Sequence, residues 1–106
     1  MKTSELTGAA LDWAVAKCEG AINGDDLDVG FILEGGYSPS TDWAQGGPII
    51  ERYGIELNRY AGEWMATLGG RVSVSEEQGP TQLIAAMRCY VAFVLGDEVE
   101  LPEELK

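Results

Sequence analysis

The feature that most constrains the fold is the apolar stretch from Leu83 to Leu95, which carries a single charge, that of Arg88. Its spacing predicts a helix over about 80–95, ended by Gly96. A helix that is apolar on nearly all sides is normally a central, buried one, so other elements are expected to surround it. Large side chains form a wide stripe, and small ones (Ala85, Cys89, Ala92) form the opposite side.

Arg88 is the exception on this apolar surface. A buried charge seldom stays unpaired, because its desolvation has to be offset by a partner. We therefore predict a carboxylate beside Arg88, with Asp42, Glu19 and Glu34 as candidates. The favoured interpretation is a structural ion pair between Arg88 and Asp42, the latter also capping main-chain amides.

A second main helix is predicted over about 8–19, where Thr7 is a suitable N-cap and Gly20 a suitable end. Trp13 projects from the side opposite the apolar stripe. Either that side is a second packing face, which is the favoured interpretation, or Trp13 is exposed for binding. The apolar stripe of the 8–19 helix consists of Leu11, Ala14, Val15 and Cys18. The small side of the 80–95 helix would let this stripe approach closely.

The residues between the two helices predict a small antiparallel sheet. Apolar and polar residues alternate on both sides of the turn at 60–63, which indicates a hairpin of strands 55–60 and 63–68. The same alternation allows a third strand over 71–75 and a short edge strand over 27–31.

Pro48 suits the first position of a short helix over about 48–53, which Gly54 would stop. The whole chain, 1–106, is then one α+β domain: two main helices and a short one packed on the sheet. The acidic tail, 97–106, is expected to be only partly ordered.

The charge balance excludes some partners. The chain has 18 acidic and 7 basic residues, a net charge of -11, so its surface should repel phosphate, and direct nucleic-acid binding is not expected. No apolar stretch reaches the roughly 20 residues of a membrane span, and we expect no membrane association. We expect a cytoplasmic protein, in which Cys18 and Cys89 are free buried thiols.

Several kinds of catalytic and cofactor chemistry lack their residues. The chain has no histidine, which removes Ser-His-Asp and Cys-His systems and imidazole metal sites. It has no CxxC, GxxxxGK[ST] or GxGxxG motif, which removes the usual zinc, redox and phosphate-cradling sites. We therefore predict no metal site, no cofactor and no enzymatic activity.

One segment is rich in recognition-type side chains, the run from Tyr37 to Gln45. Loops held on a rigid scaffold often carry function, and Tyr and Trp are enriched at binding hot spots. We predict that this segment is a binding surface, with Trp13 or Trp64 nearby. The candidate binding residues are Tyr37, Ser38, Ser40, Thr41, Asp42, Trp43, Gln45 and Trp13.

Three segments in this order, Leu11–Gly20, Tyr37–Arg52 and Leu83–Val99, resemble the NinX-type proteins of lambdoid phages and prophages. The run YSPSTDWAQGGPIIER is the specific part. More distantly, the chain is similar to phage domains described as α-β-α sandwiches. The resemblance implies a phage or prophage origin, a bacterial host and a compact α+β domain, and it supplies no catalytic residues.

Three functions follow, in decreasing order of support. The first is an accessory binding module for a host or phage protein or a small ligand. The second is an acidic inhibitor that mimics nucleic acid and blocks a host DNA-binding protein. The third is a small enzyme that uses Asp42 with a hydroxyl or Arg88. The second would require one face to gather the acids Asp25, Asp26, Asp28, Glu76, Glu77, Asp97, Glu98 and Glu100.

Overall fold

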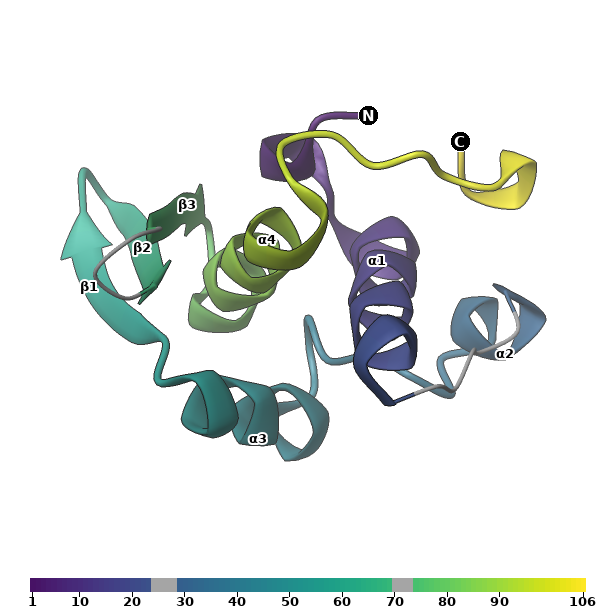
Figure 1. The fold of residues 1–106 in the computed structure, drawn as a ribbon, viewed down its shortest axis with the longest axis horizontal. Helices are drawn as coiled ribbons and strands as arrows, with labels where there is room; N and C mark the ends of the chain where they lie inside the picture. The colour runs from purple at the N-terminus through teal and green to yellow at the C-terminus, as the bar shows by residue number, and fades with distance from the viewer. Residues whose placement is uncertain (24–28, 70–73) are drawn as a thin grey trace.

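The computed structural model describes residues 1–23, 29–69 and 74–106, and this part of the chain is an α+β fold, as predicted. Figure 1 shows α4 in the middle, with the sheet on one side, α1 on the other and α3 below. The elements in chain order are η1 (Thr3–Glu5), α1 (Gly8–Asn23), α2 (Val29–Leu33), α3 (Trp43–Tyr53), β1 (Glu56–Tyr60), β2 (Glu63–Gly69), β3 (Val74–Gly79), α4 (Gln82–Leu95) and η2 (Glu103–Leu105).

The central position predicted for the apolar helix is confirmed. Helix α4 contributes seven buried residues, including Met87, Tyr90 and Val91. Thr81 caps it, because the Thr81 Oγ1 accepts a hydrogen bond from the N–H of Ile84 at 3.1 Å. The helix therefore starts two residues later than the predicted position 80.

The small side of α4 packs on β3, whereas we expected it to receive the first helix. The Ser75 hydroxyl donates to the Cys89 carbonyl oxygen at 2.9 Å, and the Cys89 thiol donates to the Ser75 carbonyl oxygen at 3.1 Å. A Cβ on Gly79 would lie 2.7 Å from the Ala85 nitrogen, so the strand approaches the helix main chain closely. The predicted free, buried state of Cys18 and Cys89 is confirmed.

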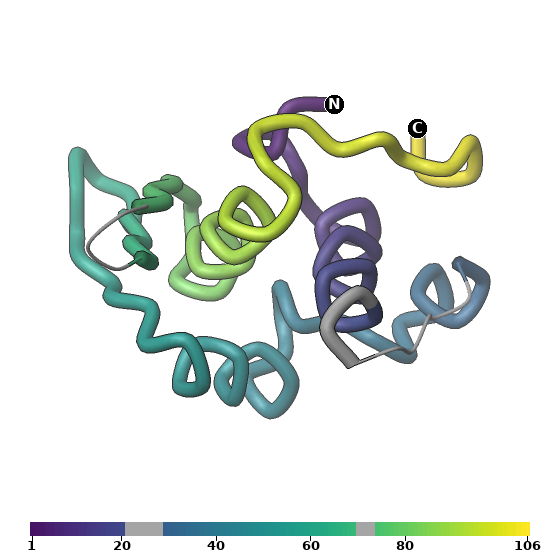
Figure 2. Tube along the Cα trace, viewed as in Figure 1, coloured from purple at the N-terminus to yellow at the C-terminus, as the bar shows by residue number. Residues whose placement is uncertain are grey.

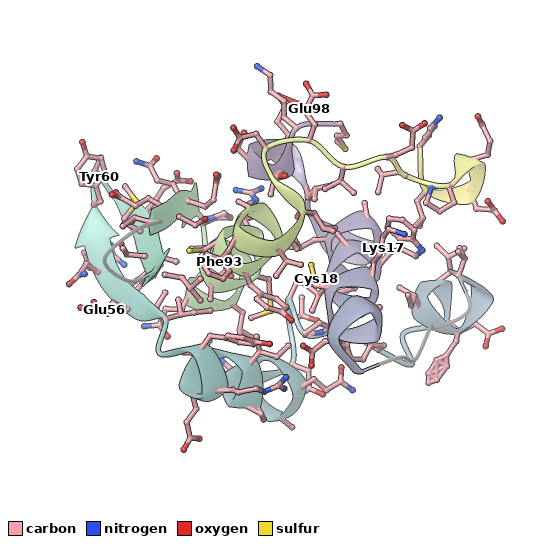
Figure 3. All side chains as sticks on the ribbon, in the orientation of Figure 1. Lys17, Cys18, Glu56, Tyr60, Phe93 and Glu98 are labelled. Atoms are coloured by element: carbon pink, nitrogen blue, oxygen red, sulfur yellow. The ribbon has the colours of Figure 1, made fainter. Side chains whose placement is uncertain are left out.

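The three strands form one antiparallel sheet in the order β1-β2-β3. The predicted hairpin is confirmed to within a residue, with Tyr60 opposite Glu63 across the turn Ala61–Gly62. Tyr60 projects from the far end of β1, as Figure 3 shows. The third strand runs over Val74–Gly79, later than the predicted 71–75, and positions 71–73 lie outside the described residues.

The predicted edge strand over 27–31 is wrong at residues 29–31, the part that the structure describes. Residues Val29–Leu33 form the short helix α2, whose Ile32 is buried while Phe31 is exposed. Periodicity cannot distinguish a strand from a helix in so short an apolar run. Positions 27 and 28 lie outside the described residues.

Two predicted helix limits are also wrong. Helix α1 continues through Gly20 to Asn23, since a glycine inside a helix costs only about 1 kcal/mol. Helix α3 begins at Trp43, five residues before the predicted start, so Pro48 lies inside it. Its predicted end is confirmed, because Gly54 has the left-handed φ of 66° that suits a helix C-terminus.

The two ends of the chain lie on the same side of the molecule (Figure 2). The Met1 ammonium donates to the Val99 carbonyl oxygen at 2.9 Å, and Lys2 and Glu98 form an isolated antiparallel bridge. Within the tail that we expected to be partly ordered, the side chains of Val99 and Leu101 belong to the core.

Candidate functional site

The segment from Tyr37 to Gln45 is fixed by its own hydrogen bonds. The Asp42 N–H donates to the Ser38 carbonyl oxygen at 2.8 Å, and the Ser38 N–H donates to the Gln45 side-chain oxygen. Pro39 is fully buried. The segment therefore has one defined shape at the point where the chain enters α3.

Asp12 ties this segment to α1. Its Oδ1 accepts a hydrogen bond from the Ser40 N–H at 2.9 Å, and the Asp12 side chain is buried. Burial raises the pKa of the Asp12 carboxyl above its ordinary value, while the Ser40 N–H and the nearby Ser40 hydroxyl act in the opposite direction. The Ser40 hydroxyl is close enough to contribute to that pKa, yet it makes no hydrogen bond of good geometry within the described part of the chain.

Asp42 has the capping role that was predicted for it. Its Oδ1 accepts a hydrogen bond from the Ala44 N–H at 2.9 Å, which satisfies one of the unpaired donors at the start of α3. Gly46 allows the first turn of α3 to pack closely against Pro39 and Leu83. A Cβ there would overlap the Pro39 carbonyl oxygen and lie 2.6 Å from the Leu83 side chain.

Trp43 and Trp64 line one cleft of about 440 Å³. Trp43 is the first residue of α3 and 52% exposed, although large apolar side chains are usually covered. Trp64 comes from β2 and packs partly against the core. The remaining lining residues come from the run before α3 and the start of α4: Ser40, Thr41, Pro80, Thr81, Gln82, Leu83 and Ile84.

Among the described residues, the lining of this cleft carries no charged side chain. The Arg59 guanidinium lies 5.0 Å from the centroid of the Trp64 ring, within the range of a cation–π contact. Helices α3 and α4 both begin at the cleft, and their starts are capped by the Asp42 and Thr81 side chains. The site is suited to a neutral, partly apolar ligand.

The predicted binding residues therefore divide into three groups. Ser40, Thr41 and Trp43 line the cleft; Tyr37, Ser38, Asp42 and Gln45 lie in the segment that supports it; and Trp13 does not line it. Trp13 packs against the core, with the Lys17 ammonium 5.6 Å from the centroid of its ring. Thr81, Gln82 and Ile84 were missed, and no sequence pattern indicates that α4 starts beside Trp43.

Tyr37 is half-buried and packs against the core. Burial and the nearby Glu19 carboxylate raise the pKa of Tyr37 to about 12, so its hydroxyl is protonated at neutral pH. Glu19 itself joins three helices: it pairs with Arg52 at 3.1 Å and accepts a hydrogen bond from the Tyr90 hydroxyl at 2.6 Å. These contacts indicate a structural role for Tyr37 and for Glu19.

The predicted ion pair between Arg88 and Asp42 is wrong. The Arg88 Nε donates to the Leu6 carbonyl oxygen at 2.7 Å, and its Nη1 donates to the Gln78 carbonyl oxygen at 2.9 Å. Two main-chain acceptors thus replace the expected carboxylate. Glu19 pairs with Arg52 instead, and among the described residues no ion pair involves Glu34 or Arg88.

Part of the acidic surface is gathered around β3 and the start of the tail. Glu76, Glu77 and Asp97 border one surface depression, and Glu98 borders a second together with Glu77 and Asp97. Burial and the nearby Asp97 charge raise the pKa of Glu77. Asp25, Asp26 and Asp28 lie outside the described residues, and Glu100 lines a separate cleft beside Met1.

Within residues 1–23, 29–69 and 74–106, no helix has the length and apolar character needed to cross a bilayer. The same residues contain no group of three or more Cys, Asp or Glu side chains placed to hold a metal ion.

Comparison with known proteins gives one family: the family model described as "Bacteriophage P22, NinX" matches residues 2–93. No curated protein matches the chain.

Proposed function

The chain belongs to the NinX family of bacteriophage P22 and is a phage accessory protein, and we propose that it acts as a binding module through the cleft between Trp43 and Trp64. In this proposal the protein works by binding, without catalysis, in the cytoplasm of the bacterial host. Its partner is a host or phage protein that inserts a short segment into the cleft.

The observation that carries the proposal is the exposure of Trp43 on a rigid support. Its indole is 52% exposed, although its neighbours Asp42 and Gly46 are held by hydrogen bonds and close packing. An exposed aromatic side chain that is already ordered contributes contact area with little loss of side-chain entropy on binding. Tryptophans in such positions are frequent hot spots of protein interfaces.

Affinity capture from phage-infected host cells tests this function. The wild-type chain is compared with Trp43→Ala, which removes the exposed indole, and with Trp13→Phe as a control outside the cleft. We expect a partner that Trp13→Phe retains and Trp43→Ala loses, with the melting temperature of Trp43→Ala within a few degrees of wild type. A partner that both variants retain equally would exclude the cleft as the binding surface.

The acidic cluster favours a second candidate function. Glu76, Glu77, Asp97 and Glu98 lie together around β3, as an inhibitor that mimics nucleic acid requires. For this candidate, Glu76→Lys combined with Glu77→Lys should abolish competition with DNA for a basic host protein. Trp43→Ala should leave that competition unchanged, and this separates the two functions.

A further inference from the structure

We infer that Asp12 of α1 is a positioning residue of the cleft between Trp43 and Trp64, because its buried carboxylate sets where the Ser40–Thr41 wall of the cleft lies. The inference rests on the proposed function, since it names the group that holds the binding surface in place. Asp12 is not among the described residues that line the cleft, and it acts through the main chain of Ser40.

The turn that forms this wall is held together by its own hydrogen bonds. The N–H groups of Thr41 and Asp42 both donate to the Ser38 carbonyl oxygen, at 3.1 and 2.8 Å. Asp42 also caps the start of α3, so the turn and the first turn of the helix form one unit. Trp43 is the next residue, and a displacement of this unit therefore displaces the indole as well. The internal bonds fix the shape of the unit but not its place on the rest of the molecule.

Asp12 connects this unit to α1. The Ser40 N–H donates to the Asp12 Oδ1 at 2.9 Å, and the two residues are only 2% and 6% exposed. Among the described residues, no other hydrogen bond joins α1 to the run from Tyr37 to Gln45. Helix α1 is itself anchored, since Leu11 and Val15 are fully buried in the core. The carboxylate thus passes the fixed position of α1 on to the turn.

The burial of this connection makes it hard to replace. Without the Asp12 oxygen, the Ser40 N–H would be left unpaired away from water, which is unfavourable for a buried donor. The turn would then move until this N–H reaches water or another acceptor, and the cleft wall and Trp43 would move with it. Asparagine keeps an acceptor oxygen at the same distance along the side chain, whereas alanine has none.

The test uses the full chain without a ligand and follows the indole N–H signal of Trp43 by NMR. We expect Asp12→Ala to shift this signal and to speed hydrogen exchange at the Ser40 N–H by about tenfold or more. Asp12→Asn should return both to their wild-type values. If Asp12→Ala does not fold, Asp12→Ser replaces it, because the shorter side chain does not reach the Ser40 N–H from the same position.

Val15→Ala is the matched control on α1. It removes buried methyl groups and leaves the Asp12 carboxylate in place, so it should lower the free energy of unfolding without moving the Trp43 signal. An equal shift in Val15→Ala would overturn the inference, because Asp12 would then act only through overall stability. An unchanged Trp43 signal in Asp12→Ala, or an equal shift in Asp12→Asn, would overturn it as well.

Affinity capture separates this inference from the proposed function. We expect Asp12→Ala to lose the partner that Trp43→Ala loses, and Asp12→Asn to retain it. A partner that Trp43→Ala loses and Asp12→Ala retains would overturn the inference and leave the proposed function standing. If the Trp43 signal follows Asp12 but no partner depends on Trp43, the positioning role is supported and the proposed function fails.

Discussion

Gly46 shows how one missing side chain shapes the site. A Cβ at this position would overlap the Pro39 carbonyl oxygen and the Leu83 side chain, whereas a Cβ on Gly47 would come no closer than 3.8 Å to Trp43. We expect Gly46→Ala to lower the free energy of unfolding by about 1–3 kcal/mol through overpacking. Gly47→Ala should raise it by about 0.5–1 kcal/mol, because alanine is the better helix former. Urea unfolding of both variants measures the difference, and equal effects would contradict the packing described here.

Arg88 provides a second prediction at the residue scale. Arg88→Met leaves the Leu6 and Gln78 carbonyl oxygens without their donor, which should cost about 1–3 kcal/mol of unfolding free energy. Since Asp42 binds the Ala44 N–H instead, Asp42→Ala should add to Arg88→Met within about 0.5 kcal/mol. A double-mutant cycle measures this sum. A coupling energy well above that limit would restore the ion pair that the sequence suggested.

At the scale of helices and strands, the sequence predicted the elements that a local residue pattern defines. The hairpin follows from strict alternation on both sides of the Ala61–Gly62 turn, and the buried helix α4 follows from its apolar surface. The start of α3 could not be predicted in this way. Pro48 is a strong local signal for a helix start, but the Asp42 cap and the fit of Gly46 move the start to Trp43.

The cap at Asp42 makes the start of α3 testable. Asp42→Ala removes the acceptor for the Ala44 N–H and should lower the free energy of unfolding by about 0.5–2 kcal/mol. Asp42→Ser keeps a capping oxygen and should recover most of that loss. Thermal unfolding can resolve the change, since about 1 kcal/mol shifts the midpoint of a domain this size by roughly 4–8 °C. Equal midpoints for the two variants would show that capping is not the role of Asp42.

At the scale of the whole molecule, the candidate site depends on contacts that sequence patterns do not contain. The composition of the segment singled out Trp43, and either Trp13 or Trp64 was expected to be near it; Trp64 lines the same cleft. Their common cleft exists because β2 and β3 pack on α4 and because α4 starts beside the Ser40–Thr41 turn. Arg88 was misassigned for the same reason, since its main-chain acceptors at Leu6 and Gln78 are brought to it only by the folded chain.

The acidity of the whole chain gives the stability a pH dependence whose sign can be derived. Burial raises the pKa of Asp12 and Glu77 above the ordinary values of 3.8 and 4.5, so the folded state holds these protons more tightly than the unfolded state. By linkage, both groups destabilise the fold when ionised, and the unfolding free energy rises as pH falls through the raised pKa values toward the ordinary ones. Repulsion among the remaining acidic groups, at a net charge of -11, acts in the same direction.

The double variant Asp12→Asn with Glu77→Gln separates the effect of these two carboxyls from that of the general repulsion among the acidic groups. The asparagine oxygen can still accept from the Ser40 N–H, so the tie to α1 is kept while the buried charge is removed. Urea unfolding between about pH 8 and pH 4 should show wild-type stability rising as pH falls, and the double variant should show a smaller rise because only the general repulsion remains. The variant should gain most over wild type at pH 8 and least near pH 4. Parallel curves would mean that these two carboxyls titrate alike in the folded and unfolded chains, and that the long-range repulsion alone sets the slope.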